Sequence, residues 1–174
     1  MARSFHRAPA THGASNAAAY PRDMSLHSSM QAAVDALRSD VRGREAVAIV
    51  KRMREAFGIG ATLGSSQAPR PVVVLEGLDG VGKSTLIDGL ERALGPNSAR
   101  LRSPPAELLH LRPYFDAHEG RDLRRAFYAL GNYACALRMR ALRADGAVVV
   151  DRFWPSTVAY ALAHDHQATP EDRP

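Results

Sequence analysis

The chain has 174 residues, of which 45% are hydrophobic and 24% charged, and this composition suits one packed domain with an extension. No apolar run approaches the ~18 residues that a membrane span needs, and the single cysteine excludes an intramolecular disulfide and a cysteine-based zinc site. The formal net charge is +5 and arises mostly from scattered arginines without interleaved aromatic residues, which favours nucleotide phosphates and an ordinary solvated surface over nucleic acid. Neither nucleic acid nor a membrane is therefore expected as a partner.

The first 70 residues divide into three segments by composition. Residues 1–28 are rich in Ala, Ser, His and Arg, which predicts a disordered or targeting segment. This composition is typical of a mitochondrial transit segment, and an untargeted tail on a cytoplasmic protein is the alternative. Residues 29–57 have apolar residues at helical spacing, interrupted at Gly43, and predict a helical extension that docks on the main domain. Residues 58–70 predict a linker.

The main domain, residues 71–174, begins with an apolar strand at 72–75, a glycine-rich loop and a helix expected at 83–94. The loop matches the pattern of a phosphate-binding P-loop in its expected context of strand, loop and helix. Its backbone N–H groups would point at phosphate oxygens, Lys83 would contact the terminal phosphates, and the Ser84 hydroxyl would ligate Mg²⁺. The residues expected to bind the ATP phosphates are Gly77, Leu78, Asp79, Gly80, Val81, Gly82, Lys83, Ser84 and Thr85.

The rest of the chain continues to alternate between strands and helices, which predicts an α/β fold with a parallel sheet. We expect a short strand at 99–102, a long helix at 119–144 and a buried strand at 147–150. His164 and Asp165 are expected in a polar loop.

Two further groups of residues are candidates for the site. Asp151 and Arg152 directly follow the third strand, at the edge of the sheet where ligands bind in open α/β folds. A carboxylate there lies beside the bound Mg²⁺ in P-loop proteins, so we expect Asp151 to hold the metal through water or Ser84. A stripe on the long helix suits a base and an anion, with a solvated helix face as the alternative. This stripe consists of Arg121, Arg125, Tyr128 and Asn132.

Several of these motifs resemble one family. Residues 74–85 resemble the P-loop of thymidylate kinases, in which an acidic residue, here Asp79, lies inside the loop. Residues 151–160 resemble the Asp-Arg-Tyr segment of that family and the helix after it. Residues 103–105 and 124–133 are most similar to the thymidylate-kinase-like branch called mitochondrial UMP-CMP kinase. The resemblance covers about residues 70–165 and implies the P-loop nucleotide kinase fold, a parallel sheet flanked by helices.

The resemblance also implies a function and the roles of individual residues. The reaction would be ATP- and Mg²⁺-dependent phosphorylation of a pyrimidine nucleoside monophosphate of the UMP, CMP, dCMP or dUMP type. Lys83, Asp151 and Arg152 would be catalytic, with Arg152 on the acceptor phosphate and Tyr128 stacked on the base. The residues that would bind the acceptor are Asp79, Arg125, Tyr128, Asn132, Arg152 and Tyr160.

The chain departs from the thymidylate kinase pattern in three places. Asn132 replaces an arginine near the base, and residues 103–105 replace a loop with a phosphate-binding arginine, so a pyrimidine other than thymine is expected. Thymidylate kinase itself is the alternative enzyme. The family continues for a further strand–helix–strand unit and an arginine-bearing lid, so the resemblance implies a chain without its last strands and lid. An inactive nucleotide-binding fragment is therefore a further alternative, and a homodimer is an option for the full-length form.

Overall fold

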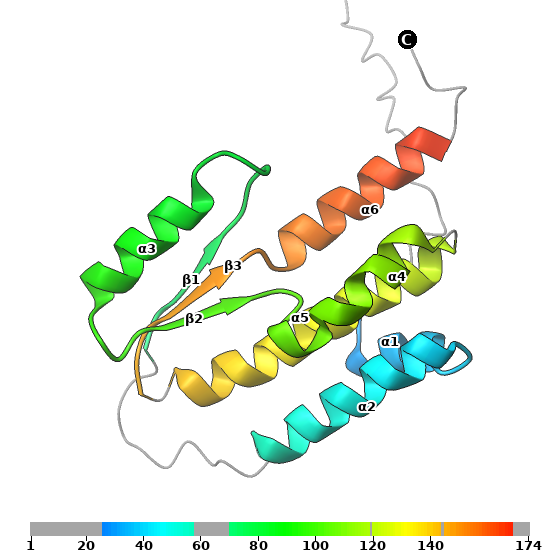
Figure 1. Cartoon of the computed structure of the whole chain (residues 1–174), viewed down its shortest axis with the longest axis horizontal. Helices are drawn as coiled ribbons and strands as arrows, with labels where there is room; N and C mark the ends of the chain where they lie inside the picture. Colours follow the sequence, from blue (N-terminus) through cyan, green and yellow to red (C-terminus); the bar gives the residue numbers. More distant parts are fainter. Residues whose placement is uncertain (1–25, 58–69, 119, 144, 169–174) are drawn as a thin grey trace, which may run out of the picture.

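The computed structural model describes residues 26–57, 70–118, 120–143 and 145–168 (Figure 1). Most of the predicted targeting segment and of the predicted linker lies outside these described residues.

Within the described residues, three short parallel strands in the order β1–β3–β2 form the sheet. They are β1 (Val72–Leu75), β2 (Ala99–Arg102) and β3 (Val148–Asp151), so the first two predictions are confirmed and the third strand is shifted by one residue. The last pairs of the register join Asp151 to Leu75 on one side and to Arg102 on the other. All three strands therefore end in step, and the segments that follow them meet at one edge of the sheet.

Helices cover both faces of this sheet. On one face, α3 (Lys83–Leu94) buries Ile87 against Val149, and on the other, α5 (Arg121–Leu142) buries Cys135 against Val148 and Val150. Successive side chains of a strand point to opposite faces, which explains why three consecutive valines of β3 are all buried. The described part of the chain is thus an α/β fold with a small parallel sheet flanked by helices.

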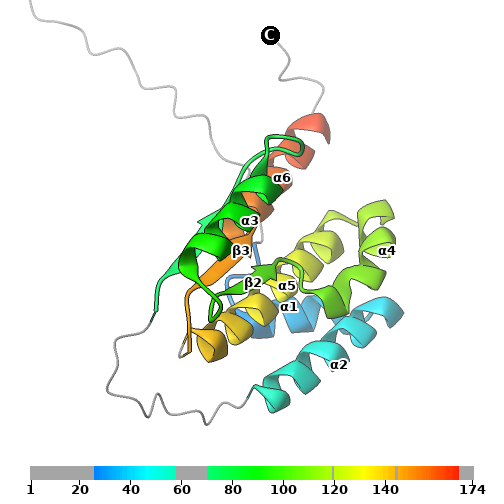
Figure 2. The ribbon, with the colours of Figure 1, turned by 60° about the vertical axis from the view of Figure 1, so that its left-hand side comes forward.

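The predicted extension forms two helices, α1 (Met30–Leu37) and α2 (Val41–Ala56), which pack on the side of α5 away from the sheet (Figures 1 and 2). The expected docking is confirmed, but the expected break at Gly43 is wrong. The helices separate just before Asp40, whose carboxylate accepts a hydrogen bond from the Gly43 backbone N–H at 2.7 Å. This N-cap places Gly43 in the first turn of α2.

Between β2 and α5 the chain forms a 3-10 helix, η1 (Ala106–Leu111), and a short helix, α4 (Arg112–Ala117). Phe115 of α4 stacks on Phe127 of α5 with ring centres 4.1 Å apart. The last helix, α6 (Trp154–Ala168), follows β3 and packs on α5. It contains His164 and Asp165, so the expectation of a loop there is wrong. Within the described ranges, no helix is long and apolar enough to cross a membrane.

Candidate functional site

A cleft of about 820 Å³ opens where the three strands end. Its lining includes residues of the P-loop after β1, of the segment 102–104 that begins with the last residue of β2, and of the segment 151–153 that begins with the last residue of β3. Helices α4, α5 and α6 contribute the remaining walls. This edge is where ligands bind in open α/β sheets, and the volume is in the range of small-molecule sites.

The lining of the cleft is strongly cationic. Lys83 and six arginines face three aspartates, namely Asp79, Asp116 and Asp151. The arginines are Arg102, Arg112, Arg121, Arg124, Arg125 and Arg152. Cations therefore outnumber carboxylates by seven to three, and such a cleft attracts ligands with several negative charges, such as nucleotide phosphates.

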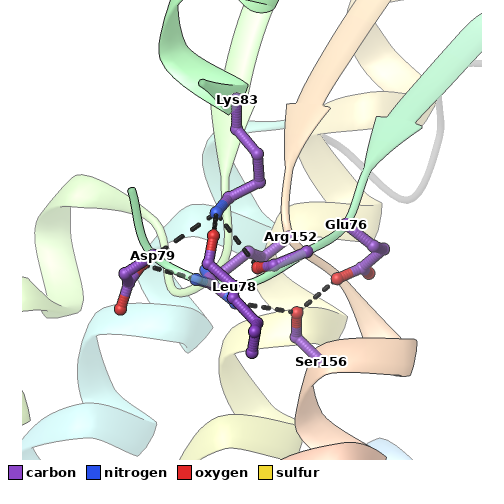
Figure 3. A network of polar contacts seen from close by, with 7 residues as sticks. Glu76, Leu78, Asp79, Lys83, Arg152 and Ser156 are labelled. Carbon is purple, nitrogen blue, oxygen red and sulfur yellow. Dashed lines mark hydrogen bonds and ion pairs between the residues drawn. The ribbon is translucent and has the colours of Figure 1, made fainter. Parts of the chain in front are cut away.

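The P-loop curls around the side chain of Lys83 (Figure 3). Gly80 and Gly82 have φ angles of 81° and 86°, in the left-handed region that glycine adopts at little cost. Gly82 is the N-cap of α3 and Lys83 is its first residue. The Lys83 ammonium donates to the carbonyl oxygen of Gly77 at 3.0 Å and to that of Leu78. The Lys83 ammonium and the N-terminus of α3 thus lie side by side, and both favour an anionic ligand between them and the loop.

Arg152 reaches the same loop from the end of β3 (Figure 3). Its Nη2 donates to Oδ1 of Asp79 at 2.6 Å, and its guanidinium lies 5.7 Å from the ring centre of Tyr160. The hydrogen bond from Arg152 lowers the pKa of Asp79. Burial alone would lower the pKa of Arg152. The hydrogen bond to Asp79 and the nearby negative groups together have the larger effect, so the pKa of Arg152 is raised. Both side chains are therefore charged at neutral pH.

Asp151 and Ser84, the expected Mg²⁺ ligands, both line the cleft. Oδ1 of Asp151 is buried and has no hydrogen-bond partner within the described residues. A metal-bound water that donates to this oxygen would satisfy it. The described residues contain no group of three or more His, Cys, Asp or Glu that could hold a metal. The unpaired oxygen of Asp151 and the hydroxyl of Ser84 would suit Mg²⁺, which proteins often hold through one or two side chains, waters and phosphates.

The stripe on α5 is partly a wall of the cleft. Tyr128 lines the cleft and donates its hydroxyl to Oδ1 of Asp116 at 2.5 Å. Burial and this hydrogen bond raise the pKa of Tyr128 to about 12. Arg125 and Arg121 also line the cleft, and both pair with Asp165 of α6, Arg121 at 3.5 Å. Three of the four stripe residues thus face the place where a ligand would lie.

Asn132, the fourth residue of the stripe, is fully buried and does not line the cleft. Its Oδ1 accepts a hydrogen bond from Ser103 at 2.5 Å, and its Nδ2 donates to Thr157 at 2.9 Å. Both of these partners line the cleft. Asn132 therefore links two walls of the cleft from behind, whereas the sequence predicted direct contact with a base.

Sequence reasoning missed several polar residues of the site, among them Glu76, Arg112, Asp116 and Ser156. Glu76 directly follows β1, and the rule that identified Asp151 at the end of β3 would also have found it. Arg112 and Asp116 enter the cleft because α4 packs on α5, a tertiary contact without a local sequence signal.

Comparisons of the chain with known protein families, with curated proteins and with solved structures found no match.

Proposed function

We propose that the protein transfers the γ-phosphoryl group of ATP to a pyrimidine nucleoside monophosphate, and that its fold is that of the P-loop nucleotide kinases. The observation that carries this proposal is the convergence of Lys83 and Arg152, with Asp79 between them, in one cationic cleft. Phosphoryl transfer depends on positioning and charge stabilisation more than on covalent chemistry by the protein. Two cations meet this need, Lys83 at the start of α3 and Arg152 just after β3.

On the donor side, the ATP phosphates would lie in the P-loop at the N-terminus of α3. They would replace the carbonyl groups of Gly77 and Leu78 as partners of the Lys83 ammonium. Ser84 and Asp151 would hold Mg²⁺, which supplies positive charge to the phosphates when bound.

On the acceptor side, Arg152 would bind the monophosphate, and the ring of Tyr128 would pack against the base. An oxygen of the acceptor phosphate attacks the γ-phosphorus in line, the bond from that phosphorus to the bridging oxygen breaks, and ADP leaves. Lys83 and Arg152 would neutralise the charge on the donor and acceptor groups during this step.

A panel of acceptors tests the proposal. Release of ADP from Mg²⁺–ATP is measured with UMP, CMP, dCMP, dUMP and dTMP, and ATP binding is measured in parallel by calorimetry. We expect the fastest turnover with one of the first four acceptors. Preference for dTMP would instead support thymidylate kinase activity, and ATP binding without ADP release would indicate a nucleotide-binding protein. Absence of ATP binding would overturn the proposal.

A further inference from the structure

Glu76, the residue between β1 and the P-loop, is bound at both carboxylate oxygens by the segment that follows β3. Figure 3 shows one of these contacts, the one with Ser156. Its Oε1 accepts a hydrogen bond from the backbone N–H of Phe153 at 2.8 Å, and its Oε2 accepts one from the hydroxyl of Ser156. The Ser156 oxygen in turn accepts a hydrogen bond from Nη1 of Arg152 at 3.2 Å. A chain of hydrogen bonds therefore links Glu76 to the guanidinium group.

Arg152 has a backbone conformation that needs support. Its φ angle is 66°, in the left-handed region that residues with a side chain seldom adopt. Its own N–H donates to the carbonyl oxygen of Leu75 at 2.9 Å, and the next N–H, that of Phe153, donates to Glu76. Hydrogen bonds to consecutive residues, Leu75 and Glu76, thus fix the main chain on both sides of this position.

The two ends of the guanidinium group have partners of different kinds. Nη2 contacts Asp79, whose side chain is 90% exposed on the P-loop. Nη1 contacts Ser156, which is partly buried and is itself bound to Glu76. An incoming phosphate can replace the exposed carboxylate at Nη2 while Nη1 keeps its partner, since Ser156 is partly buried and its hydroxyl is bound to Glu76.

We infer that Glu76 is a positioning residue, which holds Arg152 toward the P-loop through the Phe153 amide and the Ser156 hydroxyl. The functional part of this inference rests on the proposed function, in which Arg152 binds the acceptor phosphate. Glu76, which does not line the cleft, then influences the affinity for the acceptor through Ser156 and Arg152.

Two variants interrupt the chain of hydrogen bonds at different points. Ser156→Ala removes the link to the guanidinium and keeps the bond between Glu76 and Phe153. Glu76→Gln keeps an acceptor for the Phe153 amide, but its NH₂ group is a donor where Ser156 needs an acceptor. We expect each variant to raise the KM for the acceptor by about tenfold, the effect of one lost hydrogen bond to a charged group, and to change the KM for ATP by less than about twofold.

Ser98→Ala and Glu91→Gln are the matched controls. Ser98 donates to the Gly95 carbonyl oxygen at 2.7 Å, and Glu91 lies 3.7 Å from Arg100, and none of these residues lines the cleft. Both controls should leave the two KM values unchanged.

A double-mutant cycle separates positioning from a general effect on the fold. In an Arg152→Ala background, Ser156→Ala should add nothing to the KM for the acceptor, because its target is gone. An undiminished further increase in that background would overturn the inference.

A measurement without nucleotide tests the positioning directly. Side-chain ¹H–¹⁵N NMR signals of Arg152, assigned by their loss in Arg152→Ala, should show hindered rotation of the guanidinium group in the wild type. The rotation should be faster in Ser156→Ala and in Glu76→Gln. Unchanged Arg152 signals in both variants would overturn the inference, whatever the turnover. A wild type that phosphorylates no acceptor of the panel would refute the proposed function, and the NMR comparison would still decide the inference.

Discussion

At the scale of single residues, the proposed binding of the ATP phosphates depends on the ammonium group of Lys83. Its side chain is only 11% exposed, yet its partners are loop carbonyls, and it belongs to no hydrophobic cluster in the described part of the chain. Lys83→Ala therefore removes a charge without creating a cavity in the core. We predict that phosphoryl transfer falls by at least about 100-fold, as when one stabilising donor is removed from an enzyme site.

The test is an ADP-release assay together with thermal unfolding followed by circular dichroism. Lys51→Ala is the control, because Lys51 is the chain's other lysine and lies exposed on α2. Equal turnover in Lys83→Ala and wild type would refute the assignment of the P-loop.

Arg152→Ala should weaken binding of the acceptor far more than binding of ATP. The guanidinium group lies beside Asp79 at the end of β3, and its loss removes charge-assisted hydrogen bonds to a phosphate. We predict an increase of about 10- to 100-fold in the KM for the acceptor. Steady-state kinetics with each substrate varied measure this, with Arg100→Ala as the control, since Arg100 pairs with Asp88 away from the cleft. An increase confined to the KM for ATP would place Arg152 on the donor side.

At the scale of elements, α5 closely approaches the segment after β2, whose Pro104 lines the cleft. A Cβ atom on Gly131 would lie 3.0 Å from Cβ of Pro104 and 3.2 Å from its Cα. Gly131→Val should therefore push this segment away from α5, with a loss of about 1–3 kcal/mol in the free energy of unfolding. Urea unfolding measures this loss.

Gly89→Val on α3 is the matched control, because a Cβ there meets nothing within 4 Å. Valine and glycine have similar helix propensities, so we expect a change of less than about 0.5 kcal/mol. Equal stabilities of the two variants would show that the contact between Gly131 and Pro104 is not tight.

The elements that the sequence predicts most accurately are those whose ends are marked by strong local signals. The helix Lys83–Leu94 and the strand Val72–Leu75 were found to the residue, because a glycine-rich loop and the Gly95–Pro96 pair mark their limits. The sequence places the break of the extension at Gly43, whereas the structure has it before Asp40, which caps α2.

The same distinction applies to the site. The positions of Lys83 and Arg152 follow from strand ends, which are local features. The burial of Asn132 depends on Ser103 and Thr157, which come from two other segments of the chain. Helical spacing predicts which face of α5 carries Asn132, but it cannot predict which residues of other segments bind it.

At the scale of the whole molecule, one hydrophobic core joins the N-terminal helices to the wall of the cleft. Leu37 of α1 is fully buried in the cluster that contains Phe127 and Leu130 of α5, and Trp154, at the start of α6, packs against it. Leu37→Ala should therefore destabilise the whole described fold and not α1 alone. We predict a loss of about 2–5 kcal/mol in a single transition.

Circular dichroism and the fluorescence of Trp154, the only tryptophan of the chain, measure this transition by two independent signals. Val41→Ala is the control, because Val41 is 67% exposed, and it should have little effect. Two separate transitions, with Trp154 unaffected by the substitution in α1, would show that the N-terminal helices unfold independently.

The burial of Cys135 makes the packing of α5 on the sheet accessible to a chemical measurement. This is the only cysteine of the chain, it is fully buried beside Val148 and Val150, and burial raises the pKa of its thiol to about 11. Alkylating reagents attack the exposed thiolate, so the folded protein reacts only during the moments when α5 separates from the sheet. The rate of alkylation in native buffer therefore reports the free energy of that separation, and a nucleotide that binds the closed form should slow it in proportion to its occupancy.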